Sequence, residues 1–268
     1  MYPYLPDIPR LSILIPCYNE EMTIDATLDA VEQFAERALG SLTVQVVTVD
    51  DASRDGTARR LEERAESWEA GELICVRHAQ NRGKGAAIQT AREHASGDIV
   101  IIQDADLEYD PYDIPALIQP ILEGRADAVV GTRFGGAGAH RVLYFWHRMG
   151  NGGLTFLSNM FTNLNLTDME AGYKAFRREV FKLMRLTNQR FGIEPEIVAR
   201  LSQMGARVYE VPISYHGRTY AEGKKITWRD GVAALGHIVR AYLSARRQPR
   251  LPVRYRTPAR SMPAVSVR

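Results

Sequence analysis

Residues 99–111 read IVIIQDADLEYDP and place an apolar run directly before four carboxylates. The run IVII is rich in β-branched residues, which is typical of a buried strand. The carboxylates of Asp104, Asp106, Glu108 and Asp110 disfavour strand structure and repel one another at this spacing. The strand is therefore predicted to end at the acids. The acids are expected to surround a positive group, either a lysine or a metal ion that carries a substrate.

The same pattern recurs along the first half of the chain. Apolar runs that stop at polar residues occupy 11–17 (LSILIPC), 44–51 (VQVVTVDD), 73–78 (LICVRH), 98–103 (DIVIIQ) and 127–134 (DAVVGTRF). Segments with a helical spacing of apolar residues lie between them, among them 58–68 (ARRLEERAESW) and 84–95 (KGAAIQTAREHA). This alternation predicts an α/β fold with a mostly parallel central sheet and helices on both faces.

Two residues are expected to mark helix ends. Asn19 is the predicted N-cap of the first helix, and Gly97 is the predicted stop of the helix over 84–95. Further along, VYEVPISYH (208–216) is expected to be another strand and 228–247 a final helix.

Polar residues follow four of the predicted strands. They occupy 16–20, 50–51, 81–85 and 104–108. In parallel sheets ligands bind beyond the carboxyl ends of the strands. The four loops are therefore predicted to meet at one edge of the sheet and to form a site there.

The residue types at this edge suit a nucleotide and a divalent cation. Asp104 and Asp106 can bind Mg²⁺ or Mn²⁺ together with substrate phosphates. Tyr18 can pack against a base, and Asp51 can accept a hydrogen bond from the base imide.

The segment NRGKGAA (81–87) adds a candidate phosphate contact. Its glycines leave backbone N–H groups open at the start of a helix, and Lys84 adds a point charge. The alternative is a tight turn with a solvated lysine. Neither G-x-x-x-x-G-K-[ST] nor G-x-G-x-x-G occurs, which counts against P-loop enzymes and dinucleotide-binding enzymes.

Charge and composition set the remaining expectations. The chain carries +2, but residues 246–268 contain seven arginines, four prolines and no acid, so residues 1–245 carry −5. This basic tail is expected either to be a disordered end or to bind anionic lipid, and no nucleic-acid motif accompanies it. With two cysteines and no apolar run of 18 residues, we expect a cytoplasmic protein without a disulfide framework or a membrane span.

The segment 141–168 has two interpretations. It is rich in aromatic residues, Met and Leu, which is typical of a core helix pair. Its residues Tyr144, Phe145 and Trp146, beside His147 and Arg148, also suit a lipid-facing surface.

Six motifs in order carry a resemblance to a known family. They are SILIPCYNEE, VVTVDDASRDGT, NRGKGAAIQTA, GDIVIIQDADLEYDP, VVGTRF and DMEAGYKAF. Over about residues 10–230 the chain resembles the family 2 glycosyltransferases of GT-A fold, and within them the dolichyl-phosphate mannose synthases and related polyprenyl-phosphate glycosyltransferases. The resemblance implies a Rossmann-like domain over 1–245, with a nucleotide-sugar half (about 10–135) and an acceptor half (about 136–245).

The resemblance also assigns roles to single residues. It implies nucleotide-sugar contacts from Pro16, Tyr18, Glu20, Asp51, Lys84, Asp104, Lys174, Arg218, Lys224 and Lys225. It implies metal ligation by Asp104, Asp106 and Glu108, where the synthases often carry Gln at the last position. Arg133 matches an arginine near the phosphates, and Asp168 an acid near the acceptor. Lys174 stands where arginine is commoner, so a bidentate phosphate contact becomes a point charge.

The implied reaction is an inverting, metal-dependent transfer of one hexose from a GDP-mannose or UDP-glucose type donor to a polyprenyl phosphate. The Q-x-x-R-W motif of processive synthases is absent, which favours single transfer. A hydroxyl acceptor with Asp168 as general base is the alternative. A non-catalytic nucleotide-binding module and a nucleotidyltransferase are the other classes considered. The protein is expected to associate with the inner face of the membrane. The sequence leaves its oligomeric state open.

Overall fold

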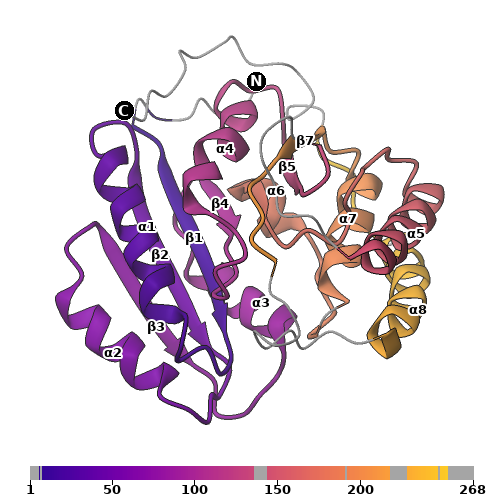
Figure 1. Ribbon diagram of the computed structural model, residues 1–268. Helices are drawn as coiled ribbons and strands as arrows, with labels where there is room; N and C mark the ends of the chain where they lie inside the picture. Colours follow the sequence, from indigo (N-terminus) through magenta and orange to yellow (C-terminus); the bar gives the residue numbers. More distant parts are fainter. Residues whose placement is uncertain are drawn as a thin grey trace.

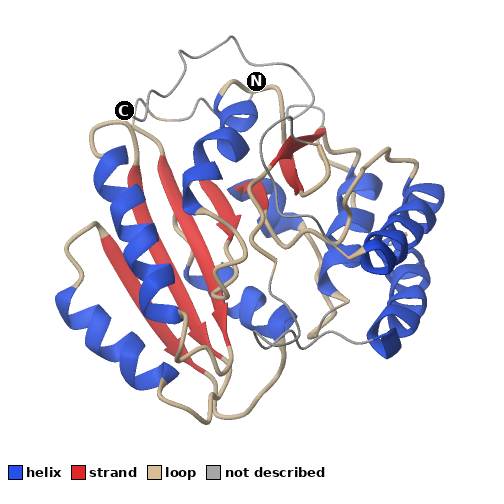
Figure 2. Cartoon of the chain, viewed as in Figure 1, coloured by secondary structure: helices blue, strands red, loops and turns tan. Residues whose placement is uncertain are grey.

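A seven-stranded sheet forms the centre of the molecule, with helices on both faces (Figures 1 and 2). The computed structural model describes residues 6, 8–135, 144–190, 192–217, 228–246 and 248–252, except for the side chains of 228–233. The strand order is β3-β2-β1-β4-β6-β5-β7. The strands are β1 (Arg10–Cys17), β2 (Thr43–Asp50), β3 (Glu72–Arg77), β4 (Ile99–Ile102), β5 (Ala128–Thr132), β6 (Lys174–Arg177) and β7 (Val208–Pro212).

Only β6 runs against its neighbours among the strands of the described chain. It pairs antiparallel with β4 and with β5, whereas β1, β2, β3 and β4 pair in parallel, as do β5 and β7. The predicted α/β fold with a mostly parallel sheet is therefore confirmed.

The helices form two layers on the sheet. One face is covered by α1 (Ile24–Ala38), α2 (Thr57–Ser67) and α4 (Ile114–Leu122), whose apolar residues share a core cluster with β1. The other face is covered by α3 (Lys84–His94), α6 (Arg178–Leu183) and α7 (Ile193–Met204). Beyond α7 lie α5 (Phe145–Thr162) and α8 (Trp228–Ala245), which pack against it and against each other (Figure 1). A short 3₁₀ helix, η1 (Pro111–Asp113), precedes α4.

Strand β6 was not predicted, because its four residues KAFR carry two charges and no alternating pattern. All four are nevertheless buried, and Ala175 pairs with both Ile101 of β4 and Val129 of β5. Since β6 is antiparallel, it starts at the edge where its neighbours end. The loop before β6 is thereby brought to the edge of the predicted site.

Both predicted helix ends were wrong. Asn19 has a left-handed backbone (φ 54°) five residues before the start of α1, and its side chain accepts a hydrogen bond from the Arg54 N–H at 2.9 Å. Helix α3 ends at His94, before Gly97. A Cβ at Gly97 would collide with the backbone of Ser12, so this glycine serves a close approach of two chain segments.

The first residues of the predicted basic tail pack on the domain. Gln248 and Leu251 are buried; the Gln248 amide donates to the Leu183 carbonyl at 2.8 Å, and the Leu251 N–H donates to the Met204 carbonyl at 2.9 Å. Residues 248–252 therefore pack on the domain, although the predicted tail begins at 246, and 253–268 lie outside the described residues.

Segment 141–168 contains one helix, α5, over its described part, and not the expected pair. None of the helices in the described ranges is both long and apolar enough to cross a membrane.

Candidate active site

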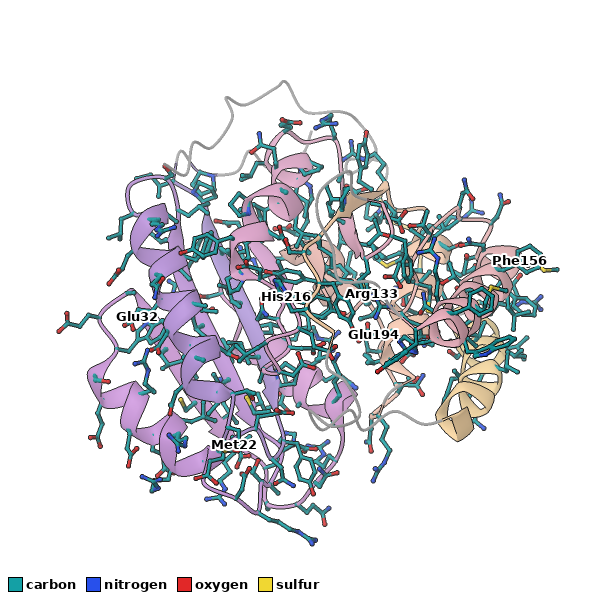
Figure 3. The ribbon with its side chains drawn as sticks, viewed as in Figure 1. Met22, Glu32, Arg133, Phe156, Glu194 and His216 are labelled. Carbon is teal, nitrogen blue, oxygen red and sulfur yellow. The ribbon has the colours of Figure 1, made fainter. Side chains whose placement is uncertain are left out.

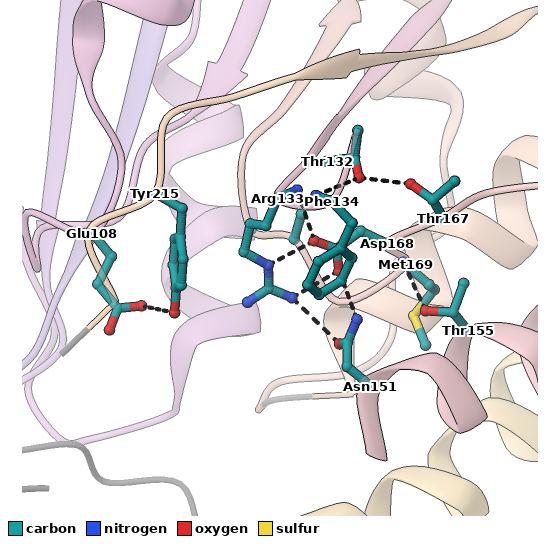
Figure 4. Close-up of polar contacts among 12 residues, drawn as sticks. Glu108, Thr132, Arg133, Phe134, Asn151, Thr155, Thr167, Asp168, Met169 and Tyr215 are labelled. Carbon is teal, nitrogen blue, oxygen red and sulfur yellow. Dashed lines mark hydrogen bonds and ion pairs between the residues drawn. The ribbon is translucent and has the colours of Figure 1, made fainter. Parts of the chain in front are cut away.

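The predicted acid turn lies at the carboxyl end of β4, and a lysine ammonium lies beside it. Lys84, the first residue of α3, places its Nζ 2.7 Å from Asp104 Oδ1 and 3.0 Å from Oδ2. Asp106 accepts a hydrogen bond from the Glu108 N–H at 3.2 Å, which tightens the turn. The Glu108 carboxylate accepts from the Tyr215 hydroxyl at 2.9 Å (Figure 4). Of the two positive groups considered from the sequence, the lysine is therefore present, although it is half-buried and not freely solvated.

An alternating chain of charges connects this turn to the second half of the molecule. Lys84 Nζ also lies 3.1 Å from Oε1 of Glu194 on α7, and Glu194 Oε2 lies 2.9 Å from Lys174 Nζ. Although burial alone would lower it, the carboxylates of Asp104 and Glu194 raise the pKa of Lys84. Burial alone would raise the pKa of Glu194, but the two ammonium groups lower it. We call Lys174, Glu194, Lys84 and Asp104 the charge ladder.

Lys174 lies deeper than a phosphate contact requires. Its side chain is fully buried, and its ammonium donates to the Met169 carbonyl at 3.2 Å, to the Ala171 carbonyl and to Glu194. With these three acceptors Lys174 supports the loop before β6 and Glu194. The structure thus places it inside the domain instead of at the donor phosphates that the motif implied.

The acid turn fits a divalent cation in its donor chemistry. Among the described residues no three His, Cys, Asp or Glu side chains converge as a complete metal site. Two carboxylates together with substrate phosphate oxygens suffice for Mg²⁺ or Mn²⁺. Asp104 and Asp106 are close enough to interact, since burial and the charge of Asp106 raise the pKa of Asp104 against the opposing effect of Lys84. Gly172 leaves space beside this pair, because a Cβ there would collide with the Asp104 carboxylate.

Asp51 holds the loop that starts α3. Its carboxylate accepts from the backbone N–H groups of Arg82 at 2.9 Å and Gly83 at 2.6 Å, and from the His78 ring at 2.6 Å. These contacts fix the NRGKG turn and thereby the position of Lys84. Asp51 thus has a structural role in addition to its predicted contact with the nucleotide base. Tyr18 is exposed at the same edge.

Pro16 and Glu20 flank Tyr18 after β1. Pro16 is the penultimate residue of β1 and is partly buried. The Glu20 side chain accepts from the Thr23 hydroxyl at 3.0 Å, and its backbone N–H donates to Thr57. The first strand end and the acid turn therefore face the same edge, as the parallel pairing of β1 and β4 requires.

A bidentate ion pair forms the other side of the site (Figure 4). Arg133, just after β5, donates from Nε to Asp168 Oδ2 at 2.6 Å and from Nη2 to Oδ1 at 2.7 Å. The Asn151 amide of α5 donates to Asp168 Oδ1 at 3.0 Å. Burial alone would raise the pKa of Asp168, but the hydrogen bonds and charge of Arg133 lower it.

Several partners hold the guanidinium of Arg133. Its Nε and Nη2 donate to Asp168 and Asn151, and the guanidinium also interacts with the Tyr215 hydroxyl. The guanidinium carbon lies 5.1 Å from the centre of the Tyr215 ring, which borders the acid turn. Arg133 is thus held rigidly at the border of the acid turn.

Sequence reasoning missed two acids of the site. Glu194 belongs to IEPEIV, where nothing local distinguishes a buried glutamate from a surface one. Glu170 lies two residues after Asp168, and its Oε1 is buried with no partner in the described structure. Burial and then the charge of Glu194 raise the pKa of Glu170 to about 7. Its position in DMEAGY was the one available signal.

Figure 3 labels Arg133, which follows β5, and Glu194 of α7 near the middle of the molecule. The structure brings together Lys84, Asp104, Asp106, Glu108, Arg133 and Asp168 at this edge. Arg218, Lys224 and Lys225 lie outside the described residues.

The chain is similar to known proteins both in sequence and in fold. The family model described as glycosyl transferase family 2 matches residues 12–184. The chain is 27% identical over 217 residues to a dolichol-phosphate mannosyltransferase of Pyrococcus furiosus, covering 80% of this chain and 59% of the relative. It is 28% identical over 218 residues to an undecaprenyl-phosphate 4-deoxy-4-formamido-L-arabinose transferase of Aeromonas hydrophila, covering 81% and 63%. The chain thus spans about six tenths of the length of these relatives.

A solved structure shares the fold. Glucosyl-3-phosphoglycerate synthase of Mycobacterium tuberculosis, in complex with Mn²⁺, UDP and glucosyl-3-phosphoglycerate, superposes with a TM-score of 0.65 at 20% identity. The match covers 88% of this chain and 80% of that one. This likeness shows the GT-A fold.

Proposed function

Because the chain belongs to glycosyl transferase family 2, we propose that it transfers a single hexose from a nucleotide sugar to a polyprenyl phosphate, with inversion at the anomeric carbon. Two relatives whose names specify dolichol phosphate and undecaprenyl phosphate support this acceptor class. The donor is of the GDP-mannose or UDP-glucose type.

The geometry of Arg133 and Asp168 is the observation that carries the choice of acceptor. A hydroxyl acceptor needs a general base, and Asp168 is poorly suited to that role because both of its oxygens accept charged or amide hydrogen bonds and its pKa is lowered. A phosphate acceptor needs a cation instead. Arg133 meets that need, since Asp168 holds its guanidinium beside Tyr215 and the acid turn.

The donor side follows from the acid turn. Asp104 and Asp106 would hold Mg²⁺ or Mn²⁺ at the donor diphosphate, where a bound cation neutralises charge that develops on the leaving group. Lys84 holds the Asp104 carboxylate in place, and its charge opposes the rise in the pKa of Asp104 that burial causes. Asp51 accepts the Arg82 and Gly83 N–H groups of the NRGKG turn, so this turn would act at the donor through Lys84.

The experiment is product analysis with a panel of nucleotide sugars, Mg²⁺ or Mn²⁺ and a short-chain polyprenyl phosphate. We expect free nucleoside diphosphate and a glycosyl phospholipid. Pyrophosphate would instead indicate a nucleotidyltransferase. Binding without turnover would indicate a nucleotide-binding module, and transfer only to sugars would indicate a hydroxyl acceptor. A thermal-shift panel of nucleoside diphosphates with Mn²⁺ would identify the base.

We also propose that this enzyme works at a membrane surface. The reason is that α5 exposes large apolar side chains and buries polar ones, the reverse of an ordinary surface helix. Its fully buried residues are polar (Asn151, Thr155, Ser158 and Thr162), and Leu154, Leu157 and Phe161 are partly buried against the core. Its exposed face is apolar: Phe145 is 65%, Trp146 81%, Phe156 67% and Met160 67% exposed. On the neighbouring helix α8, Leu235, Val239 and Leu243 are exposed as well.

Helix α5 therefore presents large apolar side chains to the outside and also supplies Asn151 to the Arg133 site. Figure 3 shows Phe156 projecting away from the ribbon. An anionic lipid surface suits this face, since Trp and Phe partition into the interface and Arg148 on the same helix is also exposed. A polyprenyl chain would then stay in lipid while its phosphate reaches Arg133.

Co-sedimentation with anionic vesicles tests the membrane proposal. We expect Trp146→Ser together with Phe156→Ser to lower binding at low and high salt, whereas Leu39→Ser, which removes another exposed side chain, leaves it unchanged. Truncation after Pro252 keeps the packed residues and removes four arginines, so it is expected to lower binding mainly at low salt. Equal binding by all variants would contradict a lipid-facing α5 and a lipid-binding tail.

A further inference from the structure

Tyr215 lies between the acid turn and the ion pair of Arg133 with Asp168. It belongs to the segment after β7, and only 6% of it is exposed. Its hydroxyl donates to Glu108 Oε2 at 2.9 Å, and its ring centre lies 5.1 Å from the guanidinium carbon of Arg133 (Figure 4). One side chain thus contacts both sides of the site.

The backbone that carries Tyr215 is attached to the acid turn. Tyr215 forms an isolated antiparallel bridge with Tyr109, and the centres of their rings lie 5.8 Å apart. The N–H of His216 donates to the Glu108 carbonyl at 2.9 Å. A Cβ at Gly217 would collide with the Tyr215 ring, so the chain that follows packs closely on it. The phenol ring therefore has a fixed position beside the turn.

The chemistry of its two charged neighbours orients the Tyr215 hydroxyl. An arginine guanidinium has only hydrogen-bond donors, and an ionised carboxylate has only acceptors. The Arg133 guanidinium interacts with the hydroxyl oxygen, which must accept on that side, so the hydroxyl hydrogen is directed to Glu108. The bond to Glu108 is charge-assisted and holds this carboxylate in one orientation.

Several contacts hold Glu108 in the acid turn. Its N–H donates to Asp106 Oδ1 at 3.2 Å, its carbonyl accepts from His216, and its carboxylate accepts from Tyr215. The two oxygens of a carboxylate offer about four acceptor positions, so a hydroxyl and a cation can bind it together. Carboxylates that bind metal ions are commonly oriented by such a hydrogen bond from a neighbouring side chain.

We propose that Tyr215 is a positioning residue that orients the Glu108 carboxylate as a further ligand of the divalent cation at the acid turn. This inference rests on the proposed function, because the cation is the one that accompanies the donor diphosphate. Arg133 orients the hydroxyl and the hydroxyl orients Glu108, so the acceptor side of the site supports the metal side.

Mn²⁺ binding in the presence of GDP, and in a second series UDP, tests this role. The free Mn²⁺ is measured by electron paramagnetic resonance. Tyr215→Phe keeps the ring and removes only the hydroxyl. We expect it to raise the Kd for Mn²⁺ about 10-fold, since partners that orient metal ligands contribute on this scale. Tyr112→Phe removes the hydroxyl of an exposed tyrosine and is the matched control, with a Kd equal to that of the wild type.

A double-mutant cycle shows whether the hydroxyl acts through Glu108. Glu108→Ala is itself expected to weaken Mn²⁺ binding. In that background Tyr215→Phe should have no further effect, because no carboxylate is left for the hydroxyl to orient. A tyrosine that merely fills space would show the same effect in both backgrounds.

Mn²⁺ binding by Tyr215→Phe that is as tight as that of the wild type, or tighter, would overturn the inference, and so would an equal loss in both backgrounds. Either result leaves the proposed function standing if the wild type transfers the hexose with Mn²⁺. A wild type whose Mn²⁺ binding depends on Tyr215 but that does not glycosylate polyprenyl phosphate would contradict the acceptor assignment and still support the role of Tyr215. A wild type that binds no Mn²⁺ with either nucleotide would contradict both the metal dependence and this role.

Discussion

Glu170→Gln is expected to stabilise the protein at pH 8 and to leave its stability nearly unchanged at pH 4.5. The substitution keeps the size of the side chain and removes its charge. In the folded protein burial and the charge of Glu194 raise the pKa of Glu170 from 4.5 to about 7. Above that pH the folded wild type holds an ionised Glu170 carboxylate that is buried and lies near the negative charge of Glu194.

The magnitude follows from this difference in pKa. At ~1.36 kcal/mol for each pKa unit, the change from 4.5 to about 7 corresponds to about 3 kcal/mol. The folded state binds more protons than the unfolded state between these two values, so the free energy of unfolding falls as pH rises through this window. Below pH 4.5 Glu170 is protonated in both the folded and the unfolded state, so its ionisation no longer lowers the free energy of unfolding. The advantage of the glutamine should therefore grow from near zero to about 3 kcal/mol.

Urea denaturation at pH 4.5 and pH 8 measures this difference. With a denaturant slope of about 3 kcal/mol per molar, the midpoint of Glu170→Gln should exceed that of the wild type by about 1 M at pH 8. Glu66→Gln, on the exposed surface of α2, is the matched control and should show no growth with pH.

An advantage of the variant that is equal at both pH values, or that shrinks with rising pH, would refute the reasoning. Either result would mean that Glu170 is no more reluctant to ionise in the folded state than in the unfolded chain.

Three further substitutions test the rest of the site. Asp106→Ala should abolish transfer and remove the metal-dependent rise in Tm with nucleoside diphosphate, while circular dichroism stays unchanged; a variant that keeps this rise would contradict the metal assignment. Asp168→Asn should lower the free energy of unfolding by about 3–5 kcal/mol in urea, because it leaves the guanidinium of Arg133 buried beside a neutral group, and an unchanged value would show that the pair is not essential. Gly172→Ala should weaken metal-dependent nucleotide binding in calorimetry, because a Cβ there would press on the acid turn, whereas Gly236→Ala has open space and should bind normally.

The layered fold and the position of the site could be predicted because both depend on local patterns. Runs such as IVII and VQVVTVD have one favourable environment, a buried strand, and the parallel arrangement forces their carboxyl ends to one edge. The acid turn at 104–108 was expected there for the same reason. These inferences need no knowledge of which segments lie side by side.

The parts that could not be predicted depend on contacts between distant segments. Strand β6 has little pattern of its own and is stabilised by β4 and β5 on either side. Lys174 resembles a phosphate ligand in its motif, but it is neutralised by Glu194, twenty residues later in the chain. Asn19 has the composition of a cap, yet it bonds to the loop after β2 instead. In each case a partner far along the sequence decides the role.

The charge ladder explains how a site assembled from both halves can work at neutral pH. Lys84 and Lys174 alternate with Asp104 and Glu194, so these four charges cancel, as do those of Arg133 and Asp168. Asp106, Glu108 and Glu170 add negative charge to these balanced pairs, so the site should attract a bare diphosphate weakly and favour one that arrives with its cation, as the proposed metal-dependent transfer requires. The pKa of Glu170 is raised to about 7, so this carboxylate can be protonated near neutral pH, which lessens its repulsion of a phosphate bound at Arg133.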